Sequence, residues 1–229
     1  MRVARSVQEQ NKGMERIDDL QFQNLKIIQD TDLPCFTQDS IQLLDFLRLR
    51  PQDRVIDLGC GTGVLSILGH GMYHASFTGL DCQEALVDLA IRSAKMNGQQ
   101  IDFRCMDVSD APKILGVGRF TAAVSNPPYY LDEGGGVDPA RDRARHGTVD
   151  ELDAFCKTAF QLLNNKGKFF LCYPAEGLSV ILSTLSNNRL EPKRIQFVKT
   201  KAGEVPYLVL IEAMKLGKSG LIIAPCKTV

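Results

Sequence analysis

Apolar and polar residues follow two different spacings along the central part of the chain. Short apolar runs that end near glycine, aspartate or asparagine predict buried strands, whereas apolar residues three and four positions apart predict amphipathic helices. The pattern predicts strands at 54–58, 76–80, 101–105, 120–125 and 168–172, and helices at 63–71, 83–96, 111–115, 150–163 and 176–187. Strands that alternate with helices are joined by crossovers, so we expect an α/β fold with a mostly parallel sheet covered by helices on both faces.

The end of the chain follows a different pattern. Two extended runs, 194–199 and 206–214, are joined by a turn at 201–204 with no helix between them. Strands joined by a short turn pair antiparallel. We therefore expect an antiparallel pair at one edge of the sheet.

The N-terminal pattern predicts a hairpin and a helix. Residues 19–22 and 25–28 alternate in polarity about Gln23-Asn24, which is typical of a β-hairpin with a short turn. Apolar residues at helical spacing over 40–49 follow Asp39, a candidate N-cap.

These N-terminal elements suggest a division of the chain. We expect residues 1–50 to form an extension packed on a core domain over 51–229. Residues 1–13 are polar and lack periodicity, so Met14 is a candidate for the physiological start.

Composition narrows the class of protein. The chain has 229 residues, of which 44% are hydrophobic and 24% charged, as in an ordinary soluble domain. Its seven cysteines form no C-x-x-C pair, and no secretory leader or long apolar segment is present. We expect a cytoplasmic protein with reduced thiols, no metal and no membrane contact.

The net charge is zero, but the charge is unevenly distributed. From Arg189 onward, eight lysines and arginines stand against three glutamates. A long loop predicted over 131–149 holds a second basic cluster, which consists of Arg141, Arg143, Arg145 and His146. Local basic charge suits contacts with phosphates, even in a neutral protein.

A glycine-rich turn follows the first strand of the core. Gly59, Gly61 and Gly63 lie between this strand and the next helix, where backbone can approach a ligand closely. The spacing differs from the dinucleotide pattern Gly-x-Gly-x-x-Gly, because position 64 is valine. A dinucleotide site is therefore disfavoured.

Carboxylates follow the next two strands. Asp81 ends one strand and Asp107 follows the other, where they are placed to reach ribose hydroxyls and an adenine amino group respectively. Either aspartate alone is typical of a turn or cap. Together with the glycines they occupy three successive strand ends, which is where open α/β sheets bind ligands.

The tetrapeptide Asn126-Pro127-Pro128-Tyr129 follows the strand at 120–125. A planar amino group is a poor nucleophile because its lone pair is delocalised. The Asn126 side-chain oxygen and the Pro127 carbonyl can accept its two N–H bonds, and the Tyr129 ring can stack on a flat substrate. The motif indicates a planar amino nitrogen as acceptor and leaves a nucleobase and an amide equally open.

Residues 57–63, Asp81, Asp107 and the tetrapeptide together resemble the motifs of class I S-adenosylmethionine-dependent methyltransferases, in the branch that modifies amino groups. The resemblance implies a Rossmann-like, seven-stranded, mostly parallel sheet with an antiparallel last strand. It also implies S-adenosylmethionine as cofactor and direct in-line transfer without a metal. The residues it assigns to the cofactor are Asp57, Gly59, Gly61, Gly63, Asp81, Asp107 and Asn126. Those it assigns to the transfer are Asn126, Pro127 and Tyr129.

A narrower resemblance rests on residues 15–20, 25–29, 36–39 and 144–146. These stretches are similar to the bacterial methyltransferases that modify the N6 amino group of the adenine beside the anticodon of a valine tRNA. The resemblance implies tRNA as partner. Its substrate-binding residues are Tyr129, Tyr130, Arg145 and His146. The family pattern continues with glutamate where this chain has Gly147, which puts any role of that glutamate in doubt.

Other acceptors remain open. The same motif serves methylation of a glutamine side chain in a release factor, although such enzymes usually carry a longer helical N-terminal domain. A guanine-N2 rRNA methyltransferase shares the reaction class. Outside enzymes, the chain could be a cofactor-binding module that interacts with RNA and has lost catalysis, although the intact motif argues against this.

Overall fold

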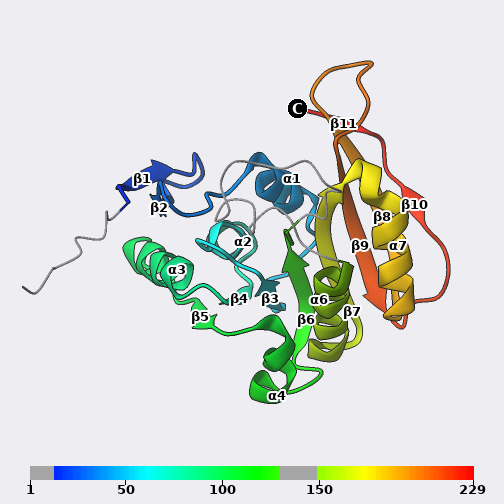
Figure 1. Cartoon of the computed structure of the whole chain (residues 1–229), viewed down its shortest axis with the longest axis horizontal. Helices are drawn as coiled ribbons and strands as arrows, with labels where there is room; N and C mark the ends of the chain where they lie inside the picture. The colour runs from blue at the N-terminus through cyan, green and yellow to red at the C-terminus, as the bar shows by residue number, and fades with distance from the viewer. Residues whose placement is uncertain (1–12, 129–148) are drawn as a thin grey trace, which may run out of the picture.

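A mostly parallel sheet forms the centre of the computed structural model, which describes residues 13–128 and 149–229 (Figure 1). Its strands run in the order β10-β8-β9-β7-β6-β3-β4-β5, and β11 also pairs with β8. The parallel part consists of β3 (Arg54–Leu58), β4 (Ser76–Asp81), β5 (Asp102–Cys105), β6 (Phe120–Ser125) and β7 (Leu163–Pro174). The remainder consists of β8 (Leu190–Lys199), β9 (Leu208–Lys215), β10 (Ile222–Ile223) and β11 (Lys227–Thr228).

The seven longer strands confirm the expected sheet. The last of them, β9, runs antiparallel to both of its neighbours, β7 and β8. The expected position at the edge is wrong for β9, which lies inside the sheet, and the short strands β10 and β11 pair with β8. Residues 208–213 are all buried, as suits an interior strand.

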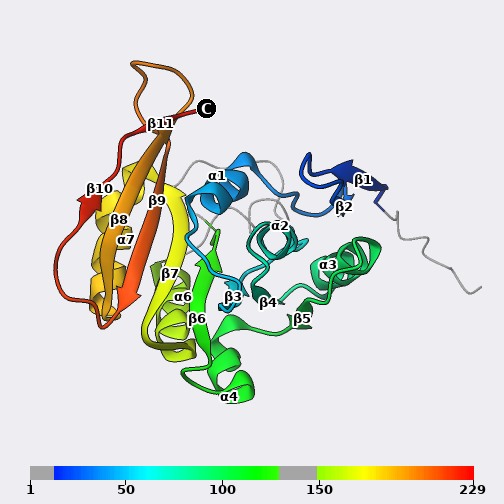
Figure 2. The same cartoon turned by 180° about the vertical axis from the view of Figure 1, so that it is seen from behind.

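Helices cover both faces of the sheet, as Figures 1 and 2 show from opposite sides. On one face lie α1 (Gln38–Phe46), α2 (Val64–Tyr73) and α3 (Glu84–Met96). On the other lie α4 (Ala111–Leu115), α6 (Val149–Leu162) and α7 (Leu178–Asn187), with 3-10 turns at Val108–Asp110 and Ala175–Gly177. Val55 packs on the first group and Ile56 on the second, because successive residues of a strand point to opposite faces. No helix of the described residues is long and apolar enough to cross a membrane.

The expected N-terminal hairpin is confirmed, but its first strand and its turn lie elsewhere in the sequence than expected. It pairs β1 (Glu15–Asp19) with β2 (Lys26–Asp30), so the predicted strand at 19–22 and the short turn are wrong. Gln21, Gln23 and Asn24 adopt positive φ in the connection. Contacts with α3 position β2: the backbone N–H groups of Lys26 and Ile28 donate to Asn97 Oδ1 and Ser93 Oγ, each at 2.9 Å.

Helix α1 starts and ends earlier than the predicted range 40–49, and Thr37, not Asp39, is its N-cap. Its last carbonyl groups are satisfied by side chains from elsewhere in the fold. The Tyr73 hydroxyl donates to the Leu44 carbonyl at 3.0 Å, and Arg194 Nη2 donates to the Phe46 carbonyl at 2.7 Å. Tertiary capping of this kind allows the helix to stop at Phe46.

Arg194 also forms a buried ion pair, and its loss should destabilise the fold. Its Nε donates to Glu212 Oε2 at 2.9 Å, and the side chains are 11% and 8% exposed. Arg194→Ala would leave Lys168 as the one cation paired with Glu212 among the described residues and would remove the cap of α1. We expect the free energy of unfolding in urea to fall by about 3–5 kcal/mol.

A control for this prediction is the exposed ion pair between Lys227 and Asp45, whose side chains are 29% and 53% exposed. Lys227→Ala should change the free energy of unfolding by less than about 1 kcal/mol. Equal effects of the two substitutions would contradict a special role for the buried pair.

Candidate cofactor and active site

The glycine turn between β3 and α2 holds three glycines in the left-handed region, Gly59 at φ 71°, Gly61 at 53° and Gly63 at 87°. The space around them differs. A β-carbon added at Gly63 would lie 2.8 Å from the Phe103 ring, and one at Gly59 would lie 3.2 Å from the Phe155 ring. At Gly61 it would meet no atom of the described residues within 4 Å. Gly59 and Gly63 thus allow close packing, and Gly61 presents its backbone to space that none of the described residues fills.

Asp81 supports the same turn. It is the last residue of β4 and is 8% exposed. Its two carboxylate oxygens accept from the Gly61 N–H at 2.9 Å and the Gln83 N–H at 3.0 Å. Burial raises its pKa, and these backbone hydrogen bonds oppose the shift. Each carboxylate oxygen offers two lone pairs, so Asp81 can hold the turn and still accept from a ligand hydroxyl.

Asp107 lies two residues beyond the end of β5. It caps the following 3-10 turn, because its Oδ1 accepts from the Ser109 N–H at 2.8 Å and from the Ser109 hydroxyl. These hydrogen bonds lower its pKa. The Met106 N–H donates to the Asp81 carbonyl at 2.9 Å, which ties Asp107 and its turn to the end of β4.

Asp57 is fully buried within β3. The Ser66 hydroxyl donates to its Oδ2 at 2.8 Å, whereas Oδ1 is buried without a hydrogen-bond partner among the described residues. Desolvation by burial raises the pKa of Asp57 to about 7, and the charge of Asp81 adds to the shift. An orphaned buried carboxylate oxygen beside an open backbone turn fits a ligand that brings donors or positive charge.

The raised pKa of Asp57 predicts a pH-dependent stability. The folded protein binds this proton more tightly than the unfolded chain, whose carboxyl has its ordinary pKa of 3.8. The stabilisation is therefore complete below that value and is lost as the pH rises through about 7. Over this window we expect the free energy of unfolding of the wild type to fall relative to that of Asp57→Asn, by on the order of a few kcal/mol. Urea titrations of both proteins at several pH values measure this, and parallel pH profiles would contradict it.

Asn126 follows directly after β6, and both ends of its carboxamide have partners. Its Nδ2 donates to Ser40 Oγ at 3.1 Å, and its Oδ1 accepts from Cys172 Sγ at 3.0 Å. The Ser125 hydroxyl donates to the Leu58 carbonyl at 2.7 Å, which ties the end of β6 to the end of β3. The four predicted residues Tyr129, Tyr130, Arg145 and His146 lie outside the described residues, as does most of the predicted loop.

The fold brings the described candidates together at one edge. β5, β4, β3 and β6 are adjacent and parallel, so their carboxyl ends lie side by side. The chain runs outward from β3 through β4 to β5 and then returns to β6 on the other side of β3. The point at which the strand order reverses in this way is the usual ligand site of an open α/β sheet.

Several residues at this edge carry no signal in the sequence. Ser40 is 86 positions from Asn126, and Cys172 is 46 positions from it. Ser66 follows the glycine turn on α2, but nothing in its spacing marks a contact with Asp57. Only the tertiary structure identifies these partners.

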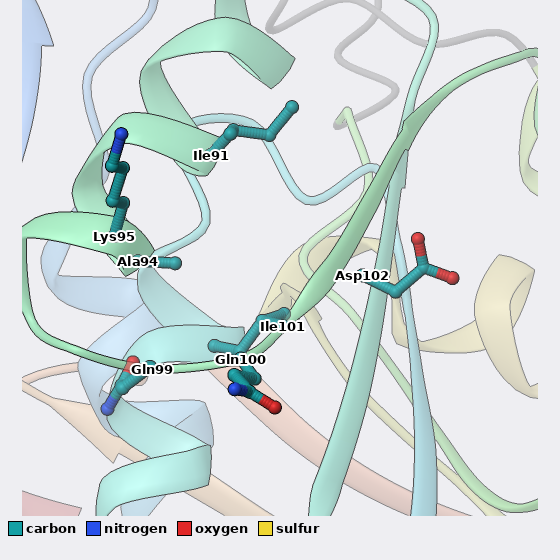
Figure 3. Close-up of a pocket in the computed structure, with 7 residues that line it drawn as sticks. All are labelled: Ile91, Ala94, Lys95, Gln99, Gln100, Ile101 and Asp102. Atoms are coloured by element: carbon teal, nitrogen blue, oxygen red, sulfur yellow. The ribbon is translucent and has the colours of Figure 1, made fainter.

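A surface pocket lies away from this edge, between α3 and the start of β5 (Figure 3). Its charged residues are Lys95 and Asp102, which Figure 3 shows on different sides of the pocket, far from converging. Asp102 is the first residue of β5, at the opposite end from the glycine turn. The pocket lacks convergent polar groups and is not a candidate for the chemistry.

Comparison with known proteins identifies the family of this chain. The family model of the methyltransferase small domain matches residues 37–177. A tRNA1(Val) (adenine(37)-N6)-methyltransferase of Tolumonas auensis is 29% identical over 196 residues, covering 83% of this chain and 80% of that protein. The protein of the same name from Bacteroides fragilis is 25% identical over 193 residues, covering 83% and 81%.

A solved structure supports the fold. The crystal structure of a predicted O-methyltransferase from Agrobacterium tumefaciens has a TM-score of 0.67 at 19% identity, and the match covers 83% of this chain and 86% of that one. The family match includes both the glycine turn and Asn126. This chain therefore belongs to the methyltransferase small domain family and is an S-adenosylmethionine-dependent methyltransferase.

Proposed function

We propose that the chain transfers a methyl group from S-adenosylmethionine to the N6 nitrogen of an adenine in a tRNA anticodon loop. The observation that carries the proposal is the position of Asn126: its carboxamide lies at the end of β6, directly beside the β3 end from which the glycine turn starts. The Asn126 side-chain oxygen, which would accept the amino hydrogens of the substrate, thus lies next to the turn assigned to the cofactor.

The cofactor is assigned to the turn and the strand ends around it. Gly61 leaves the space that the ligand would fill, and Gly59 and Gly63 shape the turn. The orphaned Oδ1 of Asp57 fits the positive charge of S-adenosylmethionine. Asp81 would accept from the ribose hydroxyls, and Asp107 from the adenine amino group.

When bound, S-adenosylmethionine supplies a methyl group on a positively charged sulfur, which is already activated for transfer. The protein then needs only to position the acceptor. The Asn126 Oδ1 and the Pro127 carbonyl would accept the two amino hydrogens, which favours a more tetrahedral nitrogen with a localised lone pair. Positioning alone supplies up to about 7–11 kcal/mol in the best cases, so alignment should dominate the rate.

The choice of adenine over an amide rests on the relatives and on local charge. Both relatives described above are named for N6 methylation of adenine 37 in a tRNA. A hairpin precedes the core among the described residues. We assign base stacking to Tyr129 and Tyr130 and RNA contacts to Arg145 and His146, from the sequence resemblance. We also propose that residues 1–50 form an extension packed on a methyltransferase domain over 51–229.

Labelled methyl transfer tests the proposal. Purified protein is incubated with methyl-labelled S-adenosylmethionine and valine tRNA transcripts that carry adenine or guanine next to the anticodon, followed by nucleoside mass spectrometry. We expect N6-methyladenosine only in the adenine transcript. Parallel reactions contain rRNA or a release factor as acceptor. Label in N2-methylguanosine of the rRNA, or in a glutamine of the release factor, would assign another acceptor, and absence of transfer to any of them would favour a non-catalytic module.

A further inference from the structure

The carboxamide of Asn126 is held between two side chains that come from opposite directions in the sequence. Ser40 lies in the first turn of α1 and is 4% exposed. Cys172 lies near the end of β7 and is fully buried. Ser40 accepts from the nitrogen end of the amide at 3.1 Å, and the Cys172 thiol donates to the oxygen end at 3.0 Å.

These two contacts constrain the orientation of the amide. Rotation about the final side-chain bond of asparagine is soft, so an amide without partners would exchange its oxygen and nitrogen ends readily. An exchanged amide would present N–H groups to the amino hydrogens of the target, which need an acceptor. A carboxamide oxygen has two lone pairs, and a thiol is only a weak donor to one of them.

We propose that Ser40 and Cys172 are positioning residues for methyl transfer, which hold the Asn126 amide with its oxygen oriented to accept from the target amino group. Helix α1 then contributes to catalysis as well as to packing. The inference rests on the proposed function of Asn126. It gives the N-terminal segment a role in the rate of the reaction. The family match alone does not indicate such a role.

Kinetics of the purified full chain test the inference. Ser40→Ala should lower kcat about tenfold, the effect of one lost hydrogen bond on a transition state. The KM for S-adenosylmethionine should stay within about twofold, because Ser40 is not among the residues assigned to the cofactor. Ser40→Thr keeps a hydroxyl and should recover most of the rate. Cys172→Ala should also lower kcat, and Cys172→Ser, which retains a donor, should restore it.

Two matched controls separate orientation from packing. Ser93, like Ser40, is a buried serine on a helix. Its hydroxyl oxygen accepts a hydrogen bond from the Ile28 N–H of the N-terminal segment at 2.9 Å. Cys156 is a fully buried cysteine on α6. Ser93→Ala and Cys156→Ala should lower stability by amounts similar to their counterparts while kcat is unchanged. If Ser93→Ala and Cys156→Ala lower kcat as much as Ser40→Ala and Cys172→Ala do, the inference is overturned.

A double-mutant cycle gives the sharpest result. In an Asn126→Ala background there is no amide to orient, so adding Ser40→Ala should change the residual single-turnover rate by less than about twofold, a strongly non-additive outcome. An equal tenfold fall in both backgrounds would show that Ser40 acts elsewhere and would overturn the inference. The side-chain amide signal of Asn126 in a nitrogen-15 spectrum should shift in Ser40→Ala and stay in place in Ser93→Ala, and an unshifted signal in Ser40→Ala would also overturn it.

The failure of this inference differs from the failure of the proposed function. If the wild type methylates tRNA and Ser40→Ala retains full kcat, the positioning role is wrong and the function stands. If the wild type methylates no RNA, the proposed acceptor is wrong and the positioning role for it falls with it.

Discussion

Asn126→Ala should lower the turnover of tRNA methylation by about a hundredfold to a thousandfold, while S-adenosylmethionine still binds. The Asn126 oxygen is the side-chain acceptor assigned to the target amino group, and loss of one preorganised group at a reacting centre costs about 10²–10³ in rate. Of the residues assigned to the cofactor, the substitution removes Asn126 alone, and the glycine turn, Asp57, Asp81 and Asp107 remain. Single-turnover methyl transfer gives the rate, and isothermal titration with S-adenosylmethionine gives the affinity, which should stay within about threefold.

Asn188 provides a control of the same residue type. Its Nδ2 donates to Asp153 Oδ1 at 2.7 Å and to the Thr184 carbonyl at 2.9 Å, where it ends α7. Asn188→Ala removes these hydrogen bonds and should reduce stability without a change in turnover. Methylation at the wild-type rate by Asn126→Ala would remove the motif from the mechanism.

Gly61→Ala should weaken binding of S-adenosylmethionine on the order of a hundredfold, equivalent to about 2.7 kcal/mol. The added β-carbon meets no atom within 4 Å in the part of the chain that the structure describes, so it would project into the space assigned to the cofactor. The affinity is measured by isothermal titration, and the free energy of unfolding of the cofactor-free protein is measured in parallel.

Gly98 offers a closely matched control. It has φ 66° against 53° for Gly61, and its added β-carbon would also meet no atom within 4 Å among residues 13–128 and 149–229. Both substitutions carry a similar backbone strain of roughly 1–2 kcal/mol. Gly98 follows α3 at the opposite end of the sheet from the turn, so Gly98→Ala should leave cofactor affinity unchanged. Equal loss of affinity in both variants would show that strain, and not occupied space, is responsible.

The core elements were predictable because each carries its own local signal. The strand at 54–58 and the helix at 111–115 have the predicted bounds, since apolar periodicity and turn residues act within a few positions. The predicted strand at 168–172 misses the start of β7 at Leu163. Residues 164–167 bulge out of the pairing between β6 and β7, and their polar sequence is typical of a loop.

The N-terminal boundaries were less predictable because contacts distant in sequence decide them. The hairpin register depends on hydrogen bonds from β2 to Ser93 and Asn97 of the α3 region. The end of α1 depends on Tyr73 and Arg194, which bind its last carbonyl groups. No periodicity within residues 14–50 contains this information.

By itself, the sequence determined the class of fold, the glycine turn, the carboxylates at the strand ends and the Asn126 motif. These features follow from local patterns, and the strand ends of a parallel sheet meet at one edge. The tertiary structure alone decided which side chains support them. Ser66 reaches Asp57, the Gly61 N–H reaches Asp81, and Ser40 and Cys172 reach the Asn126 amide. Hydrogen bonds require atoms within about 3 Å, and only the folded chain brings residues so far apart in sequence to that distance.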